Sequence, residues 1–143
     1  MSKYEGSGVT LSWAYNGGTV YTTIAQVRDI SGPSYSRETV DATVRDDPNY
    51  WNTFIKGWKD GGEMSFDIVF DSALTSHGTA SAGLLGDIDN DGTVLPKWRL
   101  TFPNADTCTF DGLVSGYEFN YAMNEPISAD LTVKVAGKPL WVI

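Results

Sequence analysis

The sequence has few of the residues that build covalent or metal-based scaffolds. Its 143 residues include one cysteine, Cys108, and one histidine, His77. A lone cysteine excludes an intramolecular disulfide, and one cysteine with one histidine excludes the usual structural zinc sites. The glycines form neither a GxGxxG nor a GxxxxGK[ST] pattern, so the common nucleotide-binding loops are also excluded.

Long apolar runs are missing as well. No stretch of about 20 apolar residues occurs in the chain, so neither a transmembrane helix nor membrane insertion by this protein is expected. The first residues lack the basic start and apolar stretch of a secretory signal peptide. We therefore expect the protein to be made and used without Sec export.

Positive charge is scarce, because 10 Lys and Arg face 18 Asp and Glu for a formal net charge of −8. Proteins that grip nucleic acids cluster Lys and Arg at the phosphates, so DNA binding is not expected here. The content of 41% hydrophobic and 13% aromatic residues is typical of a globular chain. A length of 143 residues suits one domain.

The strongest pattern in the sequence is the alternation of apolar and polar residues. In 63–71, for example, Met64, Phe66, Ile68 and Phe70 share one face, as expected for a half-buried strand. The turn residues Asn16-Gly17-Gly18 predict a first hairpin. The predicted strands cover residues 9–15, 19–30, 36–44, 63–71, 97–102, 106–110, 113–121 and 130–135.

Two segments depart from the alternation. Apolar residues in 50–58 recur at spacings of one, three and four, which predicts a short helix ended by Gly61-Gly62. Segment 72–85 predicts one main helix, weakened by Gly78 and Gly83. The chain is therefore expected to be mostly β, a β-sandwich or open barrel-like domain with one flanking α-helix.

One acidic segment resembles the start of a calcium loop. Asp87, Asp89 and Asp91 stand at positions one, three and five, with Gly92 at position six. Position twelve should be a bidentate Glu and is Trp98, so the prediction is no metal site, with this loop as the only candidate for calcium. The alternative is a polar turn, whose geometry Asp and Asn favour.

No catalytic constellation is visible, so neither an enzyme nor a cofactor is predicted. His77 lies in a polar segment and is expected at the surface, while Cys108 alternates with threonines in a strand and is expected in the core. Aromatic residues offer a different possibility, a platform for stacking sugars. Trp98 shares the apolar face of its strand, however, and Trp51 and Trp58 fit one packed helix face.

An ordered set of short segments resembles the major tail tube proteins of long-tailed bacteriophages. No single segment is diagnostic, and the resemblance runs from about residue 20 to residue 139. The segments are VRDISGP (27–33), SRETVDAT (36–43), FIKGWKDGGEMSF (54–66), FD (70–71), WRLTFP (98–103), FDG (110–112), NEP (124–126) and GKP (137–139).

The resemblance implies a tube subunit that assembles into stacked hexameric rings around a lumen through which the genome passes. It implies a single tail-tube domain over 1–143, with 1–8 as a flexible N-terminal arm and no C-terminal immunoglobulin-like domain. The implied partners are further copies of the chain and the tape measure, tail terminator and tail-tip or baseplate proteins. DNA would pass without specific binding. The implied location is the virion tail, after assembly in the host bacterial cytoplasm.

Two sets of residues are candidates for functional roles in such a tube, one at interfaces between subunits and one on the lumen wall. The aromatics Tyr50, Trp51, Phe54 and Trp58 are candidate interface anchors, because aromatics commonly carry association energy. The alternative is that they cover the core of their own subunit. Strand carboxylates on non-core faces are candidates to line the lumen, where negative charge would repel DNA phosphates: Asp29, Glu38, Asp41, Asp67 and Asp130.

A second function stays open on the residues alone. A monomeric β-sandwich that binds carbohydrate or a cell surface would also explain the aromatic content and the partial calcium loop. Such a module would remain a small particle and show sugar-dependent quenching of its tryptophan fluorescence.

Overall fold

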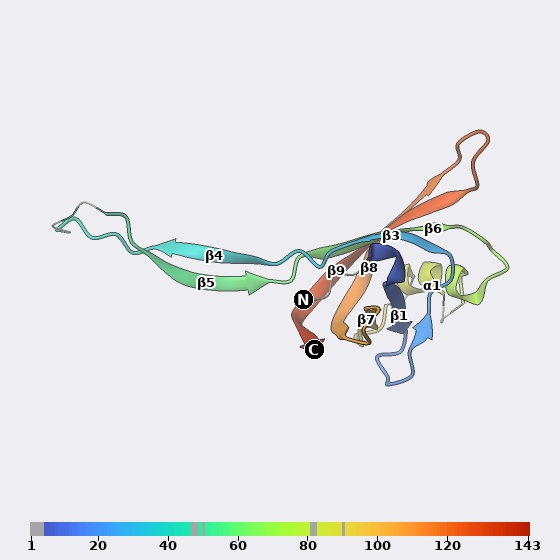
Figure 1. Ribbon diagram of the computed structural model, residues 1–143, viewed down its shortest axis with the longest axis horizontal. Helices are drawn as coiled ribbons and strands as arrows, with labels where there is room; N and C mark the ends of the chain where they lie inside the picture. Colours follow the sequence, from blue (N-terminus) through green and yellow to red (C-terminus); the bar gives the residue numbers. More distant parts are fainter. Residues whose placement is uncertain (1–4, 47–48, 50, 81–82, 90) are drawn as a thin grey trace.

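The computed structural model describes the chain except residues 1–4, 47–48, 50, 81–82 and 90. The described residues form a seven-stranded antiparallel sheet in the order β2-β1-β7-β8-β9-β6-β3 and a separate two-stranded sheet, β4-β5 (Figure 1). The strands are β1 Thr10–Ala14, β2 Thr22–Thr23, β3 Val27–Ser31, β4 Ser36–Asp41, β5 Phe54–Asp60, β6 Glu63–Val69, β7 Lys97–Thr101, β8 Thr107–Asn120 and β9 Ser128–Val142. The helical elements are η1 Gly6–Gly8, η2 Thr75–His77 and α1 Leu84–Ile88.

The core lies on one face of the seven-stranded sheet. On β6, Met64, Phe66 and Ile68 are buried while the residues between them are more exposed, as the alternation predicts. Trp13 and Trp98 are both fully buried, with ring centroids 5.0 Å apart. The prediction of a mostly β, open-barrel or sandwich-like domain is confirmed, and the sheet is open rather than closed.

The long strands β8 and β9 form the centre of the sheet, and α1 packs against β8. The predicted strands 106–110 and 113–121 are one strand, whose ladder is interrupted near Val114 and Gly116. There the Val114 amide donates to the Asp87 carboxylate at 3.1 Å, so a side chain from α1 satisfies a backbone group at the bulge. Leu84 of α1 is fully buried in the core.

The predicted helix over 50–58 is wrong, because this segment contains β5. Phe54–Asp60 pairs antiparallel with Ser36–Asp41 to give a hairpin that projects from the body (Figure 1). A strand in a two-stranded ribbon has no buried face to impose alternation, so the helical spacing of its apolar residues carried no structural information.

Two other segments differ from expectation. The main helix predicted over 72–85 is wrong: η2 and α1 stand apart, and Gly83 precedes α1 with φ −99° and ψ 150°, an extended conformation that ends continuous helix. The predicted strand over 19–30 is split into β2 and β3, with Gln26 between them at φ 58°. The local sequence carries no signal for the break before α1 or for the break between β2 and β3.

Gly62 marks the point where the β4–β5 hairpin leaves the body. Its φ is +71°, a conformation that residues with a Cβ rarely adopt, and a Cβ there would meet the Ser34 carbonyl oxygen. Its amide donates to the Asp60 carboxylate at 2.8 Å, and its carbonyl accepts from the Val135 amide at 3.0 Å. None of the helices in the described residues is long and apolar enough to cross a membrane.

Candidate functional site

The β4–β5 hairpin exposes large apolar side chains. The exposed fractions are 73% for Trp51, 57% for Phe54 and 85% for Trp58. Val40, Val44 and Ile55 on the same hairpin are also exposed. The alternative that these aromatics cover the core of their own subunit therefore does not describe Trp51, Phe54 or Trp58, whereas Tyr50 lies outside the described residues.

The β4–β5 hairpin is a two-stranded sheet separate from the main sheet. Strands β4 and β5 pair only with each other among the described residues, so each leaves one edge open. A two-stranded ribbon is marginally stable alone, and contiguous exposed apolar surface marks an interaction site. Exposed apolar side chains and open strand edges are both features of interaction surfaces, and the use of these aromatics as interface anchors stays a prediction.

A groove of about 990 Å³ lies where the base of the hairpin meets the last part of β9. We call it the groove; its apolar lining comprises Tyr35, Val40, Trp58, Val135, Pro139 and Trp141. Trp141 donates from its indole nitrogen to the Tyr35 hydroxyl at 2.6 Å and stacks on Phe102 with centroids 5.7 Å apart. These contacts hold one wall of the groove in place.

The groove has a positive rim in an acidic protein. Lys56, Lys59 and Lys138 line it, and Asp60 is the one acidic residue among its lining. Asp60 lies 3.8 Å from the Lys134 ammonium, the one ion pair among the described residues. The Asp60 carboxylate is therefore paired with Lys134, which is not part of the groove lining. The three lysines that do line the groove give its rim a net positive charge.

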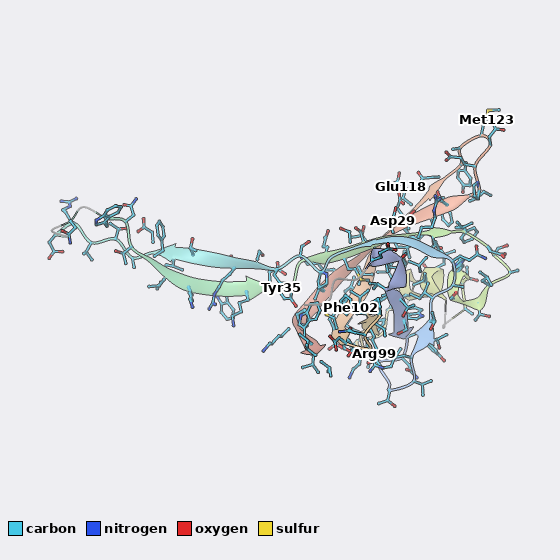
Figure 2. All side chains as sticks on the ribbon, viewed as in Figure 1. Asp29, Tyr35, Arg99, Phe102, Glu118 and Met123 are labelled. Atoms are coloured by element: carbon cyan, nitrogen blue, oxygen red, sulfur yellow. The ribbon has the colours of Figure 1, made fainter. Side chains whose placement is uncertain are left out.

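Carboxylates cross the outward face of the sheet on four neighbouring strands. Asp67 on β6 is directly opposite Asp130 on β9, and Asp130 is opposite Glu118 on β8. The Asp29 amide on β3 donates to the Asp67 carboxylate at 2.9 Å. We call Asp29, Asp67, Asp130 and Glu118 the acidic row; Figure 2 labels its two ends. Like charges directly opposite one another destabilise a sheet.

The other two predicted lumen carboxylates lie elsewhere. Glu38 and Asp41 are exposed on β4 of the hairpin, away from the sheet that carries the acidic row. Hydrogen bonds from the Thr43 hydroxyl and amide lower the pKa of Asp41. The structure thus gathers Asp29, Asp67 and Asp130 together with Glu118, which the sequence reasoning missed although it alternates on a predicted strand.

The single histidine and cysteine are both buried. The prediction of a surface His77 is wrong: its Nδ1 accepts from the Asp71 amide at 3.1 Å, and its Nε2 lies 2.7 Å from the Ala25 carbonyl oxygen. Both ring nitrogens are thus used by backbone groups. Cys108 is fully buried, as predicted, and burial raises the pKa of its thiol, which disfavours the nucleophilic thiolate.

The acidic loop after α1 has a structural use for one carboxylate. Burial raises the pKa of Asp87, whose carboxylate accepts from the Val114 amide. Asp89 and Asp91 are exposed, and Asn90 between them lies outside the described residues. Within the described part of the chain, no group of three or more His, Cys, Asp or Glu is placed to hold a metal ion.

The groove was not found from the sequence because its walls come from segments far apart in the chain. Tyr35, Trp58 and Trp141 meet only when the hairpin base lies against β9. One local signal was available in the sequence, because Lys56 and Lys59 flank Trp58. A second was Lys138, which stands three residues before Trp141 in the segment GKPLW.

Comparison with known proteins agrees with this architecture. The chain is similar to a protein in the tail of an empty GTA particle refined with C6 symmetry, at 19% identity and TM-score 0.76, covering 99% of this chain and 100% of that one. A chain of the native gene transfer agent virion matches at 17% identity and TM-score 0.77, with 99% and 100% covered. A chain of the sheath/tube terminator of the extracellular contractile injection system PVC matches at 10% identity and TM-score 0.73, with 100% and 99% covered.

These structural likenesses establish a shared fold. No curated protein sequence matches the chain. A family model described as lambda phage tail tube protein, TTP, matches residues 4–142. Because that model spans nearly the whole sequence, the resemblance read from the residues is confirmed, and the chain belongs to the lambda phage tail tube protein family, structural components of the virion tail.

Proposed function

We propose that this protein is the repeating subunit of a tail tube, assembled as hexameric rings that stack around a continuous lumen for genome delivery. The observation that carries the proposal is the β4–β5 hairpin, whose Trp51, Phe54 and Trp58 are exposed and whose two edges are open. In a monomer the apolar side chains of this hairpin stay in contact with water, whereas a heterologous contact repeated around a ring would bury them.

The acidic row supports a specific orientation of the sheet. Four carboxylates side by side cost the isolated subunit stability, but the same face turned inward would repel DNA phosphates in every ring. Transit requires that the wall not hold the genome. We place Asp29, Asp67, Asp130 and Glu118 at the lumen, and Glu38 and Asp41 with the hairpin at contacts between subunits.

The remaining partners follow from the same proposal. A tube that starts at a tail tip and ends at a terminator needs contacts with both kinds of protein, and a tape measure protein would occupy the lumen during assembly. Assembly in the host bacterial cytoplasm would place the product in the virion tail. The subunit would act without catalysis, metal or cofactor, as a single tail-tube domain whose N-terminal arm contributes to contacts between subunits.

Electron microscopy of the concentrated protein tests the proposal. The expected result is uniform rings or tubes with sixfold symmetry in end views, and a sedimentation boundary that grows with protein concentration. The competing function is a carbohydrate-binding module. Monomers at every concentration, together with sugar-dependent quenching of tryptophan fluorescence, would contradict the tube and favour that module.

A further inference from the structure

The loop that joins β8 to β9 is an exposed apolar tip. We call residues 121–127 the tip; every one of them is exposed, including Tyr121 at 75% and Met123 at 90%. The tip is anchored rather than loose at its base, because the Phe70 amide donates to the Ile127 carbonyl at 2.8 Å. Tyr121 also stacks on Phe119, with ring centroids 6.3 Å apart. A loop that is already fixed in one conformation loses less conformational entropy when it binds a partner.

The tip and the groove have complementary chemistry. The tip combines apolar side chains with one carboxylate, Glu125, and has no basic residue. The groove combines Tyr35, Trp58 and Trp141 with the unmatched positive rim of Lys56, Lys59 and Lys138. Its volume of about 990 Å³ admits several side chains. The apolar side chains of the tip therefore match the aromatic lining of the groove, and Glu125 matches its lysine rim. Complementarity of both kinds favours this specific contact over others.

The tip cannot reach the groove of its own chain. The tip directly precedes Ser128, the first residue of β9, whereas the part of β9 that lines the groove begins at Val135 and extends to Trp141. A strand rises roughly 25 Å between Ser128 and Ala136, and the tip extends beyond that distance. Figure 2 shows Met123 and Tyr35 at opposite ends of the molecule's body. Two complementary surfaces at opposite ends form a heterologous contact between copies.

We propose that the tip of one subunit inserts into the groove of a neighbouring copy, with Met123 against the Trp58 and Trp141 rings and Glu125 among the rim lysines. This inference rests on the proposed self-assembly and adds which surfaces meet. It also gives the β4–β5 hairpin a second role, because Val40 on β4 and Trp58 on β5 form part of the groove lining.

Cysteine pairing tests the contact directly. Chains carrying Met123→Cys and chains carrying Lys138→Cys are assembled as a mixture and then oxidised. A disulfide-linked dimer is expected in the mixture and in neither variant alone. Both substitutions in one chain should give a ladder of linked oligomers. The wild-type chain is the background control, since its Cys108 is 0% exposed.

The other possible occupants of the groove are tested in the same way. Ser7→Cys represents the N-terminal segment and Asn52→Cys the far end of the β4–β5 hairpin. A link from either of these to Lys138→Cys, without one from Met123→Cys, would overturn the inference. Tubes of Met123→Cys and Lys138→Cys chains that form no mutual link would also overturn it while leaving the proposed function intact. If these chains formed neither tubes nor disulfide links, both the contact between tip and groove and the proposed self-assembly would be contradicted.

Charge reversal gives an independent readout. Glu125→Lys should raise the concentration needed for assembly by about fivefold to tenfold, because it brings a cation to the lysine rim. Adding Lys138→Glu to that chain should recover most of the loss. Asp89→Lys, at an exposed carboxylate outside the tip, is the matched control and should leave assembly unchanged. An equal effect of Glu125→Lys and Asp89→Lys would contradict the contact.

Discussion

Replacing Trp58 separates the stability of the subunit from its ability to assemble. Trp58 is 85% exposed on β5, so Trp58→Ser removes almost no contact made within the subunit. Exposed substitutions usually change the free energy of unfolding by less than about 0.5 kcal/mol. The melting temperature of the unassembled protein should therefore hardly move.

The expected cost appears in association. An aromatic side chain buries roughly 200 Å² when covered, which at about 25 cal/mol per Å² sets a ceiling of ~5 kcal/mol for Trp58. Interface tryptophans lose about 2–4 kcal/mol when truncated, which is roughly 30-fold to 1,000-fold in an association constant. We expect the concentration needed for assembly to rise by such a factor.

The assay pairs thermal melting of the dilute subunit with sedimentation at increasing concentration. Trp98→Phe is the opposite control: Trp98 is 0% exposed, so its melting temperature should fall. Val20→Ser, at an 80% exposed position between β1 and β2, should affect neither quantity. Assembly of Trp58→Ser at the wild-type concentration would refute the reasoning, as would a loss of subunit stability comparable to that of Trp98→Phe.

Three further predictions concern the body of the subunit. Tyr117→Phe should raise the free energy of unfolding by about 1 kcal/mol, because the buried hydroxyl has no hydrogen-bond partner among the described residues. Burial raises the pKa of Tyr117 to about 12 from 10.0, so the unfolded chain releases this proton first; urea titrations should show stability falling between those pH values in the wild type and less in the variant. His77→Ala should lower the free energy of unfolding by about 2–4 kcal/mol in denaturant titrations, since it leaves two backbone groups unpaired beside a cavity. Asp130→Asn keeps an acceptor for the Asn120 amide and removes one charge of the acidic row, so it should raise stability by about 0.5 kcal/mol at low salt and by less at high salt. An unchanged or lowered stability in Asp130→Asn would show that the row carries no repulsion.

Strands with one buried face were predictable because burial leaves a period of two in the sequence. Met64, Phe66 and Ile68 all face the core, and so do Trp98 and Leu100 on β7. The hairpin strand β5 was not predictable in this way, because both of its faces are exposed and its partner β4 is equally exposed, so neither strand carries an alternation that reports burial.

The candidate site was partly predictable for a similar reason. Aromatic content pointed to Trp51, Phe54 and Trp58, but only the fold distinguishes exposed residues from buried ones. His77 was misplaced because its partners are backbone groups 6 and 52 residues away, which leave no pattern in the local sequence. Three carboxylates of the acidic row came from strand alternation, whereas their alignment across four strands required the register.

The measurement that tests the account most directly is a helical reconstruction of the assembled tube. The account predicts rings of six subunits with Asp29, Asp67, Asp130 and Glu118 on the lumen wall and Trp58 covered by another copy. A tube whose inner wall is neutral or basic at these positions, with Trp58 still open to solvent, would contradict it.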